Sequence, residues 1–415
     1  MTRLRDKAKD LFLVACQAAD PALALRAALS DAPLPRPDPG GAYIVVSIGK
    51  AAVPMAAELL NALDENLVRA LVITNYENAR DLPGTTIMAA GHPVPDENGA
   101  KAALAVESLL GTGTAKDRVI ALISGGGSAL LPAPVAGLSL RDKAEVNRLL
   151  LAGGVEINEI NLIRQQLSRL KGGGLLRAAA PAPVSAYILS DVIGDDLRAI
   201  ASGPTVSPIG TRADARQLLT DRGLWPNLPA SVRAHLTMPE AAVDPLPSAD
   251  NRLIGSNRKS LEAMANAANA NIVSDNLVGD VSAAADVILK AATAAKKGQP
   301  ACLIFGGETT VTLKGTGLGG RNQELALRVA MGMPDLGRDW VFLSGGTDGR
   351  DGPTEAAGGI VDAQTVPMIR ATGADPSALL ANNDSHAALK AAGALLITGG
   401  TGTNVADVQI LLLGV

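Results

Sequence analysis

Short glycine-rich turns follow five apolar stretches of this 415-residue chain. They read SIGK at 47–50, SGGGS at 124–128, GGET at 306–309, SGGTDG at 344–349 and TGGTGT at 398–403. Glycine lets the backbone approach a ligand closely, and a helix that begins after such a turn offers free N–H groups to an anion. One such turn is weak evidence, because glycine also serves tight turns that bind nothing. Five in one chain predict a cleft that handles phosphate groups.

Two basic side chains stand next to these turns. Lys50 follows an apolar run and an Ile-Gly turn, and Arg321 follows GLGG at the start of a predicted helix. Exposed lysine and arginine are usually solvated, so that interpretation stays open for both. At these positions they can also neutralise a transferring phosphoryl group or bind a carboxylate.

Carboxylates occupy similar positions at the ends of predicted strands. Asp191 lies in SDVIGDD, Glu308 in GGET, and Asp348 and Asp351 in SGGTDGRDG. Such groups can act as a general base or hold Mg²⁺ through water. Capping of a helix or a turn is the alternative for each one taken singly. Taken as a set beside a lysine and an arginine, they indicate a site.

Two nucleotide-binding motifs can be tested on the residues. A Walker A loop fails, because Ala51 follows Gly49-Lys50 and Ile44 stands at the first glycine position. The segment 315–320, GTGLGG, does fit GxGxxG and precedes a predicted helix. The next predicted strand offers no carboxylate at its tip for a ribose, so a dinucleotide site is the weaker alternative.

Composition excludes several classes of protein. Aromatic residues make up only 2% of the chain, the formal charge is −4, and no block rich in Lys or Arg occurs. A nucleic-acid partner is therefore not expected.

Two cysteines and three histidines are too few for a Cys/His zinc module or a disulfide scaffold, and they fit a cytoplasmic protein. His92 is interpreted as a residue that orders its loop. No apolar stretch is long enough for a membrane helix, so no membrane partner is expected.

Apolar runs alternate with helical patterns along the chain, which predicts a mostly parallel sheet. The predicted strands are 43–48, 70–74, 118–123, 184–189, 301–305, 340–343 and 394–398. The predicted helices include 51–63, 99–110, 141–152, 212–220, 257–270 and 281–296. A proline-rich stretch at 222–252 is interpreted as a connection. We therefore expect an N-terminal domain at 1–235 and a smaller C-terminal domain at 250–415.

With these segments in view, the chain resembles the glycerate 2-kinase family, also called class II glycerate kinases or the MOFRL family, nearly from end to end. The matching pieces are SIGKAA (47–52), GHPVPDENG (91–99), SGGGSALL (124–131), residues 157–175, LSDVIGDDLRAIASGPT (189–205), GGETTVTLKGTGLGGRNQELAL (306–327), SGGTDGRDGPTEAAGG (344–359), NNDSHAAL (382–389) and TGGTGTNVADVQILLL (398–413).

The resemblance implies transfer of the γ-phosphoryl group of ATP to the 2-hydroxyl of D-glycerate, with Mg²⁺. It implies an α/β fold: a Rossmann-like, mostly parallel domain, a second, smaller α/β domain, and an active site in the cleft between them. Lys50 and Arg321 correspond to the proposed catalytic residues, and Asp191 and Glu308 belong to the same cleft. Some members are labelled hydroxypyruvate reductase. That activity is the alternative, although hydride transfer needs a bound nicotinamide.

Within this hypothesis, the SGGGS and SGGTDG turns cradle the nucleotide phosphates. Asp191 is the first choice for orienting or deprotonating the 2-hydroxyl, and Asp191, Glu308 and Asp348 are the candidate Mg²⁺ ligands. A homodimer is left open. The predicted substrate and nucleotide contacts are Ser47, Gly49, Ser124, Gly125, Gly126, Gly127, Ser128, Glu308, Gly319, Gly320, Gly345, Gly346, Thr347 and Asp348.

Overall fold

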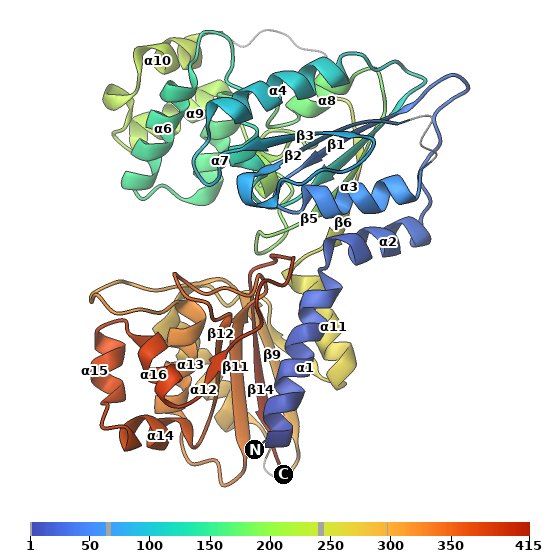
Figure 1. Cartoon of the computed structure of the whole chain (residues 1–415). Helices are drawn as coiled ribbons and strands as arrows, with labels where there is room; N and C mark the ends of the chain where they lie inside the picture. Colours follow the sequence, from blue (N-terminus) through green and yellow to red (C-terminus); the bar gives the residue numbers. More distant parts are fainter. Residues whose placement is uncertain (1, 64–67, 240–244, 297) are drawn as a thin grey trace. The chain divides into compact units, whose positions relative to one another are not determined.

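The computed structural model describes residues 2–63, 68–239, 245–296 and 298–415. These residues form two compact units, each described by itself below (Figure 1). The N-terminal unit comprises 24–190 and 195–254, and the C-terminal unit comprises the first 23 residues, 191–194 and 255–415. The units are thus not made of unbroken ranges. The expected domains at 1–235 and 250–415 are continuous ranges, unlike these units. That each range folds as a domain stays a prediction.

The N-terminal unit is built on a six-stranded sheet with the order β3-β2-β1-β4-β5-β6. Neighbouring strands from β1 to β5 pair in parallel, with Ile48 opposite both Ile73 and Ile123. This strand order is the Rossmann order, in which the chain reverses direction across the sheet between β1 and β4. The strands are β1 (Tyr43–Ile48), β2 (Val68–Asn75), β3 (Thr85–Ala90), β4 (Arg118–Ile123), β5 (Val184–Leu189) and β6 (Ala249–Gly255).

Helices cover both faces of this sheet, which is why its central strands are apolar on both sides. Figure 1 shows α3 on one face and α4 with α8 on the other. The helices and turns are α2 (Pro21–Asp31), α3 (Ala52–Asn61), η2 (Tyr76–Asn78), α4 (Glu97–Leu110), α5 (Gly127–Leu130), α8 (Gly174–Ala179) and η3 (Ile200–Ser202).

A separate group of helices has a small core of its own in the N-terminal unit. Val146, Leu150, Ile163, Leu219 and Val232 are buried there. Side-chain caps fix the starts of two of these helices, since Ser139 and Thr211 each form a capping box. The group consists of α6 (Leu140–Ala152), α7 (Ile157–Gln166), α9 (Arg212–Asp221), η4 (Trp225–Asn227) and α10 (Ala230–Thr237).

The C-terminal unit contains a second six-stranded sheet, in the order β13-β12-β11-β14-β9-β7. Only β7 and β9 pair in parallel, and the other neighbours are antiparallel. A mostly parallel sheet is therefore the wrong prediction here. The strands, including a two-stranded pair of β8 and β10, are β7 (Asn271–Ser274), β8 (Gly279–Asp280), β9 (Ala301–Gly307), β10 (Thr309–Thr310), β11 (Trp340–Gly346), β12 (Gly358–Asp362), β13 (Leu395–Leu396) and β14 (Asp407–Leu413).

Two helical layers explain why these antiparallel strands nonetheless contain continuous apolar runs, such as Ile410–Leu413 in β14. Along β14, Ile410 and Leu412 pack toward α1 and α11, whereas Leu411 and Leu413 pack toward α12 and α13. Figure 1 shows these layers on the two faces of the sheet. The helices are α1 (Thr2–Ala18), α11 (Asn257–Ala268), α12 (Val281–Ala294), α13 (Arg321–Gly332), α14 (Thr365–Ala371), α15 (Pro376–Ala381) and α16 (Ser385–Ala391).

The predicted connection at 222–252 is more structured than its prolines indicate. It contains η4 and α10, and β6 begins at Ala249 and lies beside β5. Residues 240–244 of this stretch lie outside the described residues.

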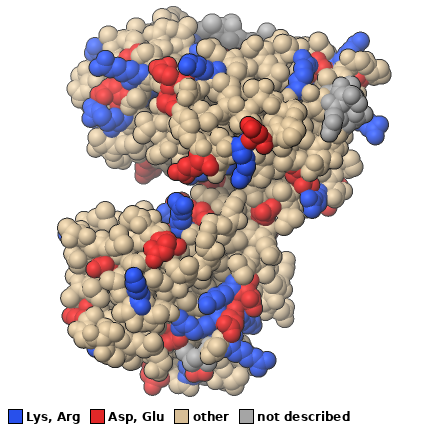
Figure 2. All heavy atoms as spheres, viewed as in Figure 1, with Lys and Arg blue, Asp and Glu red and all other residues tan. Residues whose placement is uncertain are grey.

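Within the described part of the chain, no single helix is long and apolar enough to span a membrane. The pair α1 and α2, bent by 60°, meets that criterion only when the two helices are counted together. On the face seen in Figure 2, basic and acidic side chains are interspersed over each unit and do not gather by sign.

Candidate functional site

The turns after β1 and β4 lie together where the strand order of the N-terminal sheet reverses. In open α/β sheets, ligands bind beyond the carboxyl ends of the strands at this point. Gly49 has a φ of +126°, and a Cβ there would lie 2.1 Å from Ser124 Oγ. The Lys50 N–H donates to the Gly125 carbonyl at 2.9 Å, and the Ala51 N–H donates to Ser124 Oγ at 3.1 Å. Ser124 thus holds the two predicted turns in one rigid arrangement.

Lys50 lies beside Gly126 and His92. A Cβ added at Gly126 would lie 3.3 Å from Lys50 Cγ and 3.0 Å from His92 Cδ2, and the φ of +86° at Gly126 also favours glycine. Burial and the charge of Lys50 lower the pKa of His92, although Glu77 opposes this. His92 is therefore a neutral ring near the lysine at pH 7. It also lines a cavity, so its interpretation as a loop-ordering residue is incomplete.

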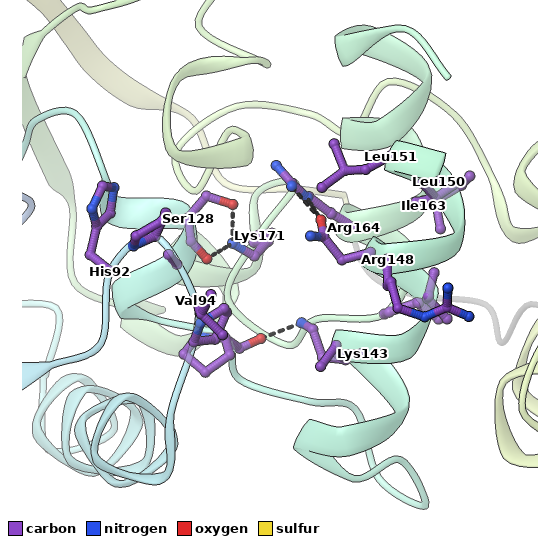
Figure 3. Close-up of a pocket in the computed structure, with 18 of the residues that line it drawn as sticks. His92, Val94, Ser128, Lys143, Arg148, Leu150, Leu151, Ile163, Arg164 and Lys171 are labelled. Atoms are coloured by element: carbon purple, nitrogen blue, oxygen red, sulfur yellow. Dashed lines mark hydrogen bonds between the residues drawn. The ribbon is translucent and has the colours of Figure 1, made fainter. Parts of the chain in front are cut away.

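A cavity of about 510 Å³ lies next to these turns, within the N-terminal unit (Figure 3). Gly126 and Ser128 line it at one end, and α6 and α7 supply much of the remaining wall. Among the described residues that line it, none is acidic. The basic residues that line it are Lys143, Arg148, Arg164 and Lys171.

Among the described residues, three of these cations have only neutral partners. Lys171 Nζ donates to Ser128 Oγ at 2.8 Å and to the Ser128 carbonyl at 2.6 Å, and Lys143 Nζ donates to the Pro132 carbonyl. Arg164 donates to the side-chain oxygen of Asn147. Arg148 is the one cation of the four with a carboxylate partner in the described part of the chain, namely Glu145. Burial and mutual repulsion consequently lower the pKa of Lys171 and of Lys143, the latter to about 7.

Lys143 should make stability depend on pH in a defined direction. The pKa of Lys143 is about 7 in the folded protein, whereas its ordinary value is 10.5. Between pH 7 and pH 10.5 the unfolded chain therefore binds more protons than the folded protein. Stability rises with pH wherever the unfolded state binds more protons. In urea titrations at pH 7 and pH 9, we expect wild type to gain more stability over this interval than Lys143→Met. Equal gains for the two proteins would show that the pKa of Lys143 is ordinary.

Arg321 begins α13 in the C-terminal unit and is held by two carboxylates. Its Nε and Nη2 donate to Asp407 at 2.6 and 3.0 Å, and its Nη1 lies 2.9 Å from Glu308 Oε1. Asp407 is fully buried, whereas the Arg321 side chain is 35% exposed. A guanidinium has five N–H donors, so two have no partner among the residues that the structure describes and remain for a ligand. Burial opposes the charge of Arg321, but its bonds to Asp407 outweigh burial and raise its pKa.

The predicted carboxylates gather near Arg321. Burial raises the pKa of Glu308; Arg321 opposes that shift, and Asp407, Asp191 and Asp348 add to it. Their oxygens are the hard donors that Mg²⁺ prefers, so the donor set fits this ion chemically. Among the residues described, no group of three or more His, Cys, Asp or Glu is placed to hold a metal. Mg²⁺ usually takes one or two carboxylates plus water and substrate phosphate, so such a group is not required.

Asp351 has a structural task. Its carboxylate accepts from the Asn322 and Gln323 N–H groups at 3.1 and 2.8 Å, and thereby caps the start of α13. A Cβ at Gly320 would lie 2.3 Å from the Asp351 carboxyl carbon. Gly320 and Asp351 therefore position Arg321 through the helix that it begins.

The GTGLGG segment packs against residues 382–385 of the same unit. A Cβ at Gly315 would lie 2.3 Å from the Asn382 carbonyl oxygen, and one at Gly319 would lie 2.2 Å from Ser385 Oγ. The strand that follows, β11, pairs antiparallel with both of its neighbours. A dinucleotide fingerprint needs a parallel βαβ unit. The interpretation of this segment as a dinucleotide-binding loop is therefore wrong.

Several other predicted contacts serve the fold. Ser47 Oγ donates to the Ala52 carbonyl, and Thr347 Oγ1 donates to the Ala406 carbonyl. A Cβ at Gly127 would lie 3.0 Å from that of Ala201, and one at Gly346 would lie 2.7 Å from the Arg350 carbonyl oxygen. Their roles as ligand contacts stay predictions.

Gly345 should prove important for stability. A Cβ there would lie 2.7 Å from the Phe12 ring and 2.8 Å from Leu396 Cδ2, so we expect Gly345→Ala to lose about 1–3 kcal/mol of unfolding free energy through overpacking. Urea titration measures this. Gly400→Ala is the matched control, because a Cβ there meets nothing within 4 Å. An unchanged midpoint for Gly345→Ala, together with lost ligand binding, would favour the predicted nucleotide contact.

Residue-by-residue reasoning missed the cationic wall of the cavity and the buried partner of Arg321. Lys143, Arg164 and Lys171 lie on or after helices, away from the glycine-rich turns, and Asp407 begins the last strand. Two of these cations fall in the stretch 157–175 that resembles the glycerate 2-kinase family. The resemblance of that stretch to the family is the sequence signal that could have pointed to Arg164 and Lys171.

A Rossmann-ordered sheet with a cation-lined cavity, and a second unit with an arginine among carboxylates, are typical of an α/β enzyme that acts on a small anion. The first family match, described as a domain of unknown function (DUF4147), spans residues 7–237. The MOFRL family matches residues 301–407.

Full-length relatives agree with these matches. The chain is 40% identical over 381 residues to a D-glycerate 2-kinase of Thermotoga maritima, covering 89% of this chain and 90% of the relative. A crystal structure of glycerate kinase from Thermotoga maritima superimposes with a TM-score of 0.91, at 38% identity and with full coverage of both chains. A relative from Agrobacterium vitis with a provisional name of hydroxypyruvate reductase is 40% identical over 397 residues, covering 90% of this chain and all of the relative. The chain belongs to the glycerate kinase family.

Proposed function

We propose that this protein is a glycerate 2-kinase, which transfers the γ-phosphoryl group of ATP to the 2-hydroxyl of D-glycerate and releases 2-phosphoglycerate and ADP. The observation that carries the proposal is the 40% identity to a D-glycerate 2-kinase across nine-tenths of both chains. The two free cysteines suit the cytoplasmic location that is part of the proposal. A homodimer stays open and takes part in no step.

Phosphoryl transfer depends mainly on positioning and on stabilising negative charge. Lys50 supplies a positive charge on a turn that Ser124 holds rigid, and Arg321 supplies two unused N–H donors. We assign both to the anionic oxygens of the substrates. Each contributes to the rate by binding the transition state more tightly than the substrates.

The chemical step breaks one bond and forms one. The oxygen of the 2-hydroxyl bonds to the γ-phosphorus, the bond from that phosphorus to the β–γ bridging oxygen breaks, and ADP leaves. The hydroxyl proton goes to a carboxylate, for which Asp191 is our first choice. Glu308 and Asp348 would hold Mg²⁺, which when bound supplies positive charge to the phosphate oxygens.

Release of ADP tests the proposal most simply. The protein is incubated with ATP, Mg²⁺ and one small hydroxy acid at a time: D-glycerate, L-glycerate, glycolate, D-lactate or tartrate. We expect ADP release to depend on D-glycerate and to be much slower with acids that lack its pattern of hydroxyls. Release at the same rate without any acid would show an ATPase and contradict the proposal.

The reductase activity is kept as the second candidate because of the name that some relatives carry. The packing of the GTGLGG segment against Asn382 and Ser385 removes the sequence feature that favoured it. A parallel assay follows oxidation of NADH and NADPH with hydroxypyruvate. Cofactor oxidation that depends on the protein, without ADP release from ATP and glycerate, would favour the reductase.

A further inference from the structure

We propose that the cationic cavity of the N-terminal unit is the nucleotide site, in which Lys171, Lys143 and Arg164 bind the phosphates of ATP and the apolar end receives the base. The inference rests on the proposed kinase function and adds a location and three residues to it. Four observations support it: uncompensated charge, size, the distribution of apolar side chains, and continuity with Lys50.

The charge of the cavity calls for a polyanion. Lys143, Arg164 and Lys171 face one another without a carboxylate partner among the described residues, and Arg169 on the adjacent segment is paired with Glu107. Buried like charges repel, and each lowers the affinity of its neighbours for protons. A ligand with several negative charges removes this repulsion. Glycerate, with a single carboxylate, would leave most of it in place.

The size of the cavity also favours the nucleotide. Its volume of about 510 Å³ falls within the range of about 300–1,000 Å³ that is typical of pockets for drug-sized ligands. A three-carbon acid would occupy only a small part of it. The remainder would hold only water beside apolar side chains such as Leu150, Leu151 and Ile163.

The lining has a mainly polar end, toward which Val94 also lies, and a mainly apolar end, which also contains Arg148. Figure 3 shows His92 and Ser128 on one side, Leu150, Leu151 and Ile163 on the other, and the Lys171 amine between them. Leu151 is 60% exposed, which is unusual for a leucine beside a core that buries Leu150. A ligand with a charged and a flat, weakly polar part, such as a nucleotide, matches this division.

The polar end leads to the reactive lysine. Gly126 lines the cavity and packs against Lys50 Cγ, so the same glycine borders both. A nucleotide with its base near Leu151 and its phosphates along Lys171 would direct its terminal phosphate toward Lys50. The cavity and the catalytic lysine are then parts of one site.

Binding of ADP by titration calorimetry, without any turnover, tests the inference. We expect Lys171→Met and Lys143→Met each to weaken ADP binding about 10–100-fold, as the loss of one charge-assisted hydrogen bond does. Lys101→Met is the matched control, because Lys101 is an exposed lysine on α4 outside the cavity, and should bind like wild type. Circular dichroism confirms that each variant is folded. If Lys171→Met does not fold, Lys143→Met decides.

A second variant tests the position of the base. Leu151→Asp should weaken ADP binding but leave binding of inorganic tripolyphosphate within about 2–3-fold of wild type, apart from a small repulsion. Unchanged ADP affinity in Lys171→Met, Lys143→Met and Leu151→Asp would overturn the inference. So would a rise in the KM for glycerate with an unchanged KM for ATP, which would assign the cavity to the acid.

The kinase proposal and the cavity proposal fail separately. A protein that phosphorylates glycerate while the lysine variants bind ADP normally is a kinase with its nucleotide elsewhere. A protein that binds ADP through these lysines but phosphorylates none of the acids keeps its nucleotide site and contradicts the proposed function.

Discussion

Replacing Arg321 with methionine is expected to lower kcat for glycerate phosphorylation by about 10²–10⁴-fold, comparable to the loss of a transition-state donor in other enzymes. The two N–H groups that Asp407 and Glu308 leave unused are the donors that are lost. Arg321→Lys keeps the charge but not the planar fork, and should recover only part of the rate. Steady-state kinetics with ATP and D-glycerate measure both variants.

Stability must be separated from catalysis in this experiment, because Arg321→Met leaves the buried Asp407 without its partner. Arg328→Met is a matched control. Arg328 lies on the same helix and also pairs with a buried carboxylate, Glu324, but it is not a predicted site residue. Both variants should lose stability, and only Arg321→Met should lose the rate. A similar loss of kcat in both would reduce Arg321 to a structural role.

Replacing Lys50 with methionine should have an effect of the same order, about 10²–10⁴-fold in kcat. Little stability should be lost, because the Lys50 N–H bond to Gly125 and the glycine packing around it involve the backbone or the stem of the side chain. Kinetics and urea titration on the same preparation measure both quantities. Lys101→Met should behave as wild type in each assay.

The assignment of Lys50 has a clear point of failure. Full activity of Lys50→Met, with unchanged KM for ATP and for glycerate, would remove it from the catalytic machinery. A raised KM for ATP with normal kcat would instead make it a binding residue that acts equally on substrate and transition state.

Much of the N-terminal sheet could be predicted from apolar runs. Residues 43–48, 118–123 and 184–189 are strands with the predicted limits, because strands covered on both faces are continuously apolar. The direction of the C-terminal strands could not be predicted in this way. Two helical layers make the end of an antiparallel strand, such as Ile410–Leu413 of β14, equally apolar. Strand β12 was missed because two glycines begin it.

Part of the candidate site could be predicted, since a turn at a strand end has a position fixed by topology. Gly126 and Ser128 line one cavity, Lys50 lies beside Gly126, and Arg321 lies beside Glu308. The cations of the cavity were missed because they come from helices or from the turn after α7, where lysine and arginine are commonly solvated. What distinguishes Lys171 is its burial, which only packing reveals.

The position of the phosphoryl group on the product tests the central claim most directly. The product of ATP and D-glycerate is passed to enolase, which dehydrates 2-phosphoglycerate to an enol phosphate that absorbs in the ultraviolet. We predict that absorbance rises at once, without added phosphoglycerate mutase. A rise only after the mutase is added would show phosphorylation at the 3-hydroxyl, and would contradict the proposed function.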